Sequence, residues 1–120
     1  MDIKIRKFES NYVIDASGEV DLYNAHRLKD VVRAMMQKQV RVFILNLKKV
    51  TYVDSSGIAA VLAIHALLAQ EGMEFRIVNV SRPVQRVLEL TRLVSFLPIM
   101  ANELEAIESI TAGKPAAPGL

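Results

Sequence analysis

The chain has 120 residues, a net charge of +2 and no cysteine. This length corresponds to one domain with its own core, and the lack of cysteine excludes disulfide bonds and thiolate metal sites. No cluster of lysine and arginine suggests a nucleic-acid partner. The N-terminus does not have the pattern of a signal peptide, and no apolar run is long enough to span a membrane. We therefore expect a cytoplasmic protein that neither binds nucleic acid nor inserts into a membrane.

The first half of the chain predicts a hairpin, a helix and a central strand. Residues 3–8 and 12–20 each show the alternation of a strand, and Gly18 inside the second predicts a bulge or a close backbone approach. Asp21 precedes a helical pattern, where its carboxylate would cap the helix. Residues 40–47 are mostly apolar, which predicts a strand covered on both faces.

A short polar stretch then leads into the most apolar helical pattern of the chain. Residues 48–54 are expected to connect the strand to Ser55, Ser56 and Gly57, and Lys48 and Lys49 are expected to lie in a solvated turn. The helix should run from about Ser56 to Glu71. It is apolar on nearly all sides, so we expect it to be largely buried or partly covered by a partner. Residues 74–80 predict the next strand.

The last third predicts two helices around a short strand. Ser81 with Pro83 two residues later has the pattern of a helix start, with a hydroxyl cap. Pro98 suggests that residues 96–100 form an edge strand. Asn102 opens a capping-box pattern for a helix to about residue 111. Residues 112–120, rich in glycine and proline, are expected to be a disordered tail.

The element order is therefore β-β-α-β-α-β-α-β-α within one domain over residues 1–111. Single helices between strands favour parallel pairs with right-handed crossovers. The leading hairpin adds an antiparallel pair. We predict an α/β fold with a mixed, mostly parallel sheet and helices packed on it.

The residues give little support to catalysis. A serine nucleophile needs a base within hydrogen-bond reach, but His65 lies ten residues after Ser55, about 15 Å along one helix. His26 is the other histidine, and nothing in the sequence requires it to approach. The Gly-x-Ser-x-Gly elbow, the phosphate-binding loop and the dinucleotide fingerprint are all absent. We expect no catalytic residue, no metal and no cofactor.

The stretch Asp54-Ser55-Ser56-Gly57 lies between the buried strand and the apolar helix. Either serine could cap the helix, since serine is a favoured N-cap residue, and an anion could bind at the same place. Capping needs one hydroxyl, however, and the stretch supplies two. The second hydroxyl is free for another role.

Two motifs make the sequence resemble the STAS domain family, specifically its stand-alone anti-sigma factor antagonists. One is Gly18-Glu19-Val20-Asp21 in the second strand, and the other runs from Leu45 to Ile58 and contains Asp54-Ser55-Ser56-Gly57. The resemblance covers about residues 3–111. It implies a STAS-like fold and a regulatory role without enzymatic activity.

The resemblance also implies a role for each matching residue. Ser55 takes the place of the serine that an ATP-binding anti-sigma factor or related switch kinase phosphorylates, and that a PPM-type serine phosphatase restores. Partner binding is implied for five further positions, namely Asp21, Asp54, Ser56, Gly57 and Ile58. The ATP belongs to the kinase. Ser56 then becomes the candidate helix cap.

Two other functions stay open at this point. A STAS subunit of a scaffold or lipid-transport complex would use the same surface without phosphorylation. A small hydrolase with Ser55 as nucleophile would need a base and an elbow that the sequence does not supply.

Overall fold

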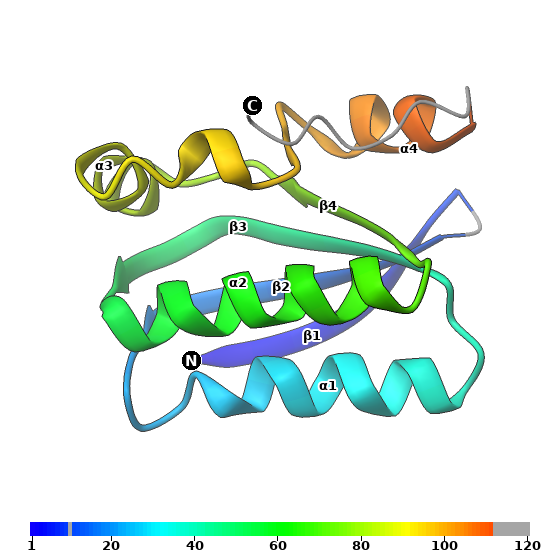
Figure 1. The fold of residues 1–120 in the computed structure, drawn as a ribbon, viewed down its shortest axis with the longest axis horizontal. Coiled ribbons are helices and arrows are strands. Elements are labelled where there is room, and N and C mark those ends of the chain that lie inside the picture. Colours follow the sequence, from blue (N-terminus) through cyan, green and yellow to red (C-terminus); the bar gives the residue numbers. More distant parts are fainter. Residues whose placement is uncertain (10, 112–120) are drawn as a thin grey trace.

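A computed structural model describes residues 1–9 and 11–111 and shows one five-stranded sheet with helices on both faces (Figure 1). The strands follow the order β1-β2-β3-β4-β5; β1 and β2 are antiparallel, and the other neighbours are parallel. This confirms the predicted mixed, mostly parallel α/β fold. The strands are β1 (Asp2–Phe8), β2 (Asn11–Val20), β3 (Val42–Val53), β4 (Glu74–Val78) and β5 (Ile99–Met100). The helices are α1 (His26–Gln37), α2 (Ser55–Gln70), α3 (Arg82–Leu90), the 3-10 turn η1 (Val94–Phe96) and α4 (Glu103–Thr111). The tail expected over 112–120 lies outside the described residues.

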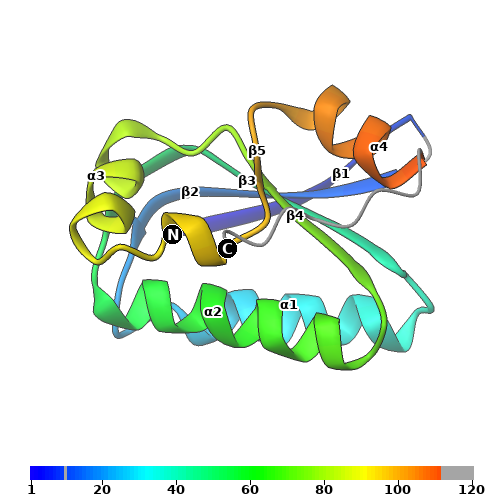
Figure 2. The ribbon, with the colours of Figure 1, turned by 45° about the horizontal axis from the view of Figure 1, so that its top comes forward.

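The sheet separates two apolar clusters of unequal size. Helices α1 and α2 lie side by side on one face, and α4 lies on the other (Figures 1 and 2). The larger cluster lies on the face covered by α1 and α2, which we call the inner face. It joins this face to α1, α2 and α3, and Val84 and Leu88 of α3 are buried in it. The smaller cluster centres on Ile44 and Ala106 beneath α4. The central strand β3 is thus covered on both faces, as the apolar pattern of residues 40–47 indicates.

Strand β3 begins at Val42 and ends at Val53, so it starts two residues later and ends six residues later than the strand expected over 40–47. The register between β3 and β2 shifts twice, and at each shift β3 contains one residue more than β2 between successive paired positions. These bulges reset the alternation, so that Leu47, Val50 and Val53 are all buried although they lie three residues apart. Lys48 and Lys49 are therefore exposed strand residues, and the predicted turn there is wrong.

Two of the expected helix caps are also wrong. Helix α1 begins at His26, five residues after Asp21, because residues 21–25 form a hydrogen-bonded turn instead. Ser81 precedes α3 but makes no side-chain cap, since its hydroxyl donates to the carbonyl oxygen of Val50 at 2.7 Å. Asn102 does cap α4, because its side-chain oxygen accepts from the amide of Glu105 at 2.9 Å.

Gly18 lies at the second register shift and has a φ of +85°. Residues with a Cβ rarely adopt this conformation, so the bulge needs glycine. The predicted irregularity at Gly18 is confirmed.

A polar network connects α4 to the outer face of the sheet. The guanidinium of Arg6 on β1 donates to both carboxylate oxygens of Asp15 on β2 and to the carboxylate of Glu103 on α4. The amide of Asn46 on β3 donates to Asp15 at 2.7 Å. The hydrogen bond to Asp15, followed by that to Glu103, raises the pKa of Arg6. The network therefore ties three strands and the last helix together.

Candidate functional site

The N-terminus of α2 is held by Asp54, the last residue before the helix. Its backbone is extended, with φ −106° and ψ −175°, and Oδ1 accepts from the amide of Gly57 at 3.0 Å. An acceptor here satisfies one of the free amides of the first turn. Asp54 is therefore the cap, and the prediction that Ser56 caps the helix is wrong. The carboxylate reaches the amide because the extended strand β3 runs directly into the helix.

The same carboxylate joins α2 to a second segment. Oδ2 of Asp54 accepts from the amide of Leu22 at 3.0 Å, 32 residues away in the chain. Leu22 belongs to the turn over residues 21–25 that connects β2 to α1. The amide of Asp54 donates to the carbonyl oxygen of Val20 at 3.2 Å. One carboxylate thus bonds the helix start with Oδ1 and the turn with Oδ2, which fixes the turn beside the start of α2.

Asp21 shapes the turn from within. Its carboxylate accepts from the amide of Tyr23 at 3.0 Å, and its carbonyl oxygen accepts from the amide of Ala25 at 2.9 Å. Its own amide donates to the side chain of Asn24 at 2.9 Å. Asp21 therefore does not cap α1, but it belongs to the same site as Asp54. The structure brings the two sequence motifs together through this turn.

The two serines of the motif differ in exposure. Ser55 is the first residue of α2 and is exposed, whereas Ser56 is half-buried. A phosphate on Ser55 would stand at the positive end of a helix. Ser55 is accordingly the more accessible of the two hydroxyls.

Gly57 and Ile58 hold the helix start against the sheet. A Cβ on Gly57 would lie 2.5 Å from Cγ2 of Val53 and 3.0 Å from the carbonyl oxygen of Val20. Glycine is therefore required for the close approach of α2 to β2 and β3. Ile58 is 6% exposed and belongs to the core. Their predicted contact with a partner stays a prediction, and the structure gives both a packing role.

Sequence reasoning missed three exposed apolar residues on the two segments that meet at Asp54. Leu22 and Tyr23 in the turn are 68% and 85% exposed, and Tyr52 near the end of β3 is 48% exposed. Large apolar side chains at such exposure mark candidate contact surfaces. The sequence signal was the pair Leu22-Tyr23 directly after the Gly18–Asp21 motif, where a surface turn would ordinarily be polar.

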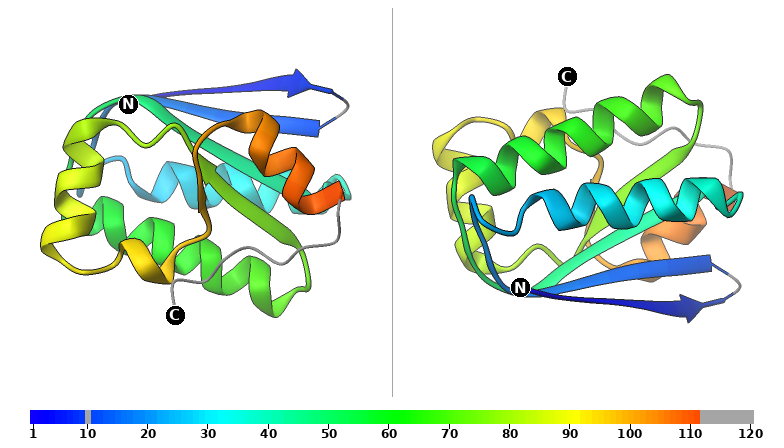
Figure 3. Two further views of the ribbon diagram at one scale, coloured as in Figure 1. Left: turned by 90° about the horizontal axis from the view of Figure 1, so that it is seen from above. Right: turned by 90° about the horizontal axis from the view of Figure 1, so that it is seen from below.

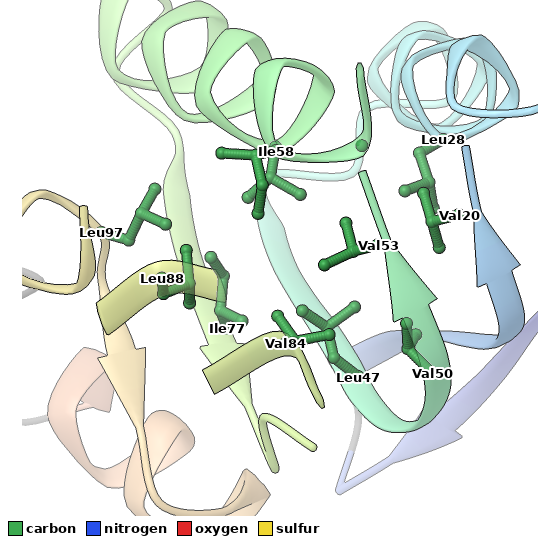
Figure 4. Close-up of a pocket in the computed structure, with 12 residues that line it drawn as sticks. Val20, Leu28, Leu47, Val50, Val53, Ile58, Ile77, Val84, Leu88 and Leu97 are labelled. Atoms are coloured by element: carbon green, nitrogen blue, oxygen red, sulfur yellow. The ribbon is translucent and has the colours of Figure 1, made fainter. Parts of the chain in front are cut away.

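Behind the site lies a small apolar cavity of about 20 Å³. Figure 4 shows Val20, Val53 and Ile58 lining it beside residues from α1, α3 and β4. Apolar cavities of this size stay dry because water finds no hydrogen-bond partners there. The wall behind Ser55 is therefore packed core, with no room for a substrate.

The geometry does not supply a catalytic base from α2. His65 lies on the same helix as Ser55, ten residues further along. Its ring packs on Phe75 of β4, with centroids 6.0 Å apart. Within residues 1–9 and 11–111, no three histidine, aspartate or glutamate side chains form a group that could hold a metal ion. In the same part of the chain, no helix has the length and apolar character to cross a membrane.

The STAS domain model matches residues 2–106, and the chain therefore belongs to the STAS domain family. An anti-sigma F factor antagonist of Paenibacillus polymyxa is 30% identical over 115 residues, covering 92% of this chain and 95% of that protein. An anti-sigma-B factor antagonist of Staphylococcus aureus is 29% identical over 108 residues, covering 90% and 98%. The likeness thus extends over nearly the whole length of both relatives.

Solved structures agree with the fold. The anti-sigma factor antagonist SpoIIAA in its unphosphorylated form has a TM-score of 0.72 at 22% identity, covering 93% of this chain and 97% of that one. The phosphorylated form of the Bacillus SpoIIAA has a TM-score of 0.67 at 24% identity, covering 91% and 99%. Both carry the same arrangement of sheet and helices.

Proposed function

We propose that this chain is an anti-sigma factor antagonist that acts as a phosphorylation-controlled switch. Unphosphorylated, it binds an anti-sigma factor or an ATP-binding serine kinase, and phosphorylation of Ser55 releases that partner. The observation that carries the proposal is the exposed hydroxyl of Ser55 at the start of a helix whose cap, Asp54, also fixes the neighbouring turn. The names of the two curated relatives support it. The proposal gives this chain no enzymatic activity, since the kinase supplies ATP and a PPM-type serine phosphatase removes the phosphate.

The contact surface in this proposal centres on Ser55 and the turn over residues 21–25. Tyr23 and Leu22 offer apolar side chains of the kind that anchor protein interfaces. Hydrogen bonds from the amides of Leu22 and Tyr23 fix the backbone that carries these side chains before the partner arrives. Preorganisation of this kind lowers the entropic cost of binding.

Phosphorylation opposes binding through charge and bulk. A phosphate adds about −1.5 to −2 charges. The helix N-terminus stabilises that charge in the free protein by roughly 0.3–1 kcal/mol, so the fold is retained. At an interface the phosphate must lose water beside the carboxylate of Asp54, and an unpaired like charge there costs several kcal/mol. A loss of about 3 kcal/mol lowers affinity more than a hundredfold.

The test compares Ser55→Ala, Ser55→Asp and the matched pair Ser56→Ala and Ser56→Asp as baits in the native cell, with phosphopeptide mapping. We expect Ser55→Ala to retain an ATP-binding kinase constitutively and the Ser55→Asp protein to bind it at least a hundredfold more weakly in calorimetry. All four variants should unfold within about 1 kcal/mol of wild type, because Ser55 is exposed and Asp54 makes the cap.

Two results would contradict the switch. One is a Ser55→Asp protein that binds the captured kinase as tightly as wild type. The other is phosphate mapped to Ser56 and not to Ser55 in protein recovered from the cell.

A further inference from the structure

The β1–β2 hairpin extends beyond the helices that cover the inner face of the sheet. Figure 3 shows α2 and α1 side by side and the hairpin projecting past α1. On the inner face of this overhang, Ile5 is 50% exposed and Tyr12 is 41% exposed. Ile14, the partner of Ile5 across the hairpin, is buried. The helix layer thus ends at α1 and leaves apolar residues of the hairpin uncovered.

A continuous groove runs between this overhang and the flank of α1. Two adjoining hollows of about 390 and 450 Å³ share Ile5 and Val31 and form what we call the hairpin groove. Its floor comes from the strands and its wall from one side of α1, where Ala34 leaves room for close approach. The wall extends from Arg27 to Lys38, which is about 17 Å or three helical turns. The groove is long and open to solvent, and its lining combines apolar residues with the charged residues Arg27, Asp30 and Lys38.

The charges at the groove are predominantly positive. Arg27 and Lys38 line the groove, against a single acid, Asp30. Arg41 lines an adjoining hollow at the Lys38 end. All four side chains belong to exposed residues, and Arg27 already donates to the carbonyl oxygen of Met1 at 2.8 Å. Lys38 and Arg41 are therefore the cations placed to meet charges on a bound molecule. An occupant therefore needs an apolar stripe with acidic residues on its flanks.

The charges also argue against a symmetric dimer at this face. A twofold contact places the same patch on both sides, so the predominantly positive lining of one copy would face that of the other. Like charges that face each other across an interface weaken association. The shape favours a helix over an extended strand, because an added strand would lie along the free edge of β1 and leave the wall of α1 uncovered. A helix beside α1 would continue the existing layer.

We propose that the hairpin groove is a second docking surface, which receives an acidic amphipathic helix of a partner protein. The helix lies along α1 and places its apolar stripe on Ile5, Tyr12 and Val31. Its acidic flanks meet Lys38 and Arg41. This surface is built from different residues than the Ser55 site, so the proposal stands independently of the phosphorylation switch.

The test uses two stapled 18-residue helical peptides with the same leucine stripe, flanked by glutamate in one and by lysine in the other. Each is titrated into the ¹⁵N-labelled full chain at low salt. We expect the glutamate peptide to shift the amides of Ile5, Tyr12 and Ala34 and to bind at least tenfold more tightly than the lysine peptide. The double variant Lys38→Glu/Arg41→Glu should reverse this preference, and Ala34→Arg should abolish binding by filling the groove.

Arg33→Glu serves as the matched control, since Arg33 is exposed on α1 outside the groove lining. It should bind the glutamate peptide within about twofold of wild type. Equal binding of both peptides, shifts that map to α2 instead, or no shift at millimolar peptide would overturn the proposal. So would concentration-dependent dimerisation through the same amides, because that would make a second copy the occupant.

Discussion

The side chain of Asp54 carries two structural tasks with two oxygens. One oxygen caps α2 at Gly57, and the other holds the turn at Leu22. Removing the first costs the helix an amide partner, and removing the second frees the turn that carries the exposed Tyr23. A single carboxylate therefore links helix stability to the shape of the candidate interface.

We predict that Asp54→Ala lowers the free energy of unfolding by about 1–2 kcal/mol, since loss of an N-cap costs about that much. Asp54→Asn keeps one oxygen acceptor and should lose less. Urea denaturation gives the order, and hydrogen exchange should show faster exchange of the Leu22 and Gly57 amides in Asp54→Ala. Unchanged hydrogen exchange of the Leu22 amide would contradict the role of Asp54 in holding the turn.

Gly57 provides a sharper test of packing. In Gly57→Ala the new methyl group would collide with Val53 at 2.5 Å and with the backbone of β2. Overpacking of this kind costs about 1–3 kcal/mol. Urea denaturation should show the loss, whereas Ser56→Ala on the same turn adds no atom and should change stability by no more than about 0.5 kcal/mol. Equal effects of the two variants would show that the helix start can shift away from the sheet.

At the scale of elements, α2 contacts β4 through a partly buried histidine. His65 packs on Phe75, and its Nδ1 is buried with no hydrogen-bond partner among the described residues. Burial lowers the pKa of His65 from its ordinary value of 6.5. The folded chain therefore binds the proton more weakly at this ring than the unfolded chain does.

This difference fixes the sign of a pH effect. Stability rises with pH wherever the unfolded state binds more protons, so His65 contributes most above its ordinary pKa of 6.5. The contribution is lost as the pH falls from that value toward the lowered pKa of the folded state. We predict that wild type loses stability relative to His65→Gln across this window, measured by urea denaturation at several pH values. A constant difference between the two proteins would contradict this.

At the scale of the whole molecule, the Arg6 network is the polar contact between α4 and the hairpin. Arg6 is 38% exposed as a side chain, and Glu103 is 16% exposed, so the pair is partly shielded from water. Truncating Arg6 would leave two carboxylates, Asp15 and Glu103, close together without their cation. Half-buried charges left in this way destabilise more than a surface pair does.

We therefore predict that Arg6→Met lowers the free energy of unfolding by about 1–3 kcal/mol, between the values for exposed and buried pairs. Adding Glu103→Gln to Arg6→Met should recover part of the loss, since one unpaired charge is removed. Urea denaturation of the two variants measures both effects. A double variant less stable than Arg6→Met alone would show that Glu103 has another stabilising role.

Local patterns in the sequence were enough to predict the order of strands and helices and several local features of the fold. Alternation and helical periodicity indicate the order of elements, because they depend on neighbours in the chain. Pro98 and Gly18 indicate the edge position of β5 and the irregularity in β2, because each residue type restricts the backbone at its own position. The motif around Ser55 likewise indicates the start of an apolar helix, whereas the same pattern placed the end of the preceding strand at Leu47, six residues too early. Residues that follow each other in the chain need no tertiary contact to reveal these features.

Tertiary structure decided the features that depend on distant partners. The bulges of β3 arise from pairing with β2, so the burial of Val50 and Val53 does not follow from their own alternation. The choice of Asp54 over Ser56 as cap, and the second bond to Leu22, depend on how the end of β3 meets the turn after β2. The uncovered groove beside α1 likewise exists only because the sheet is wider than its helix layer.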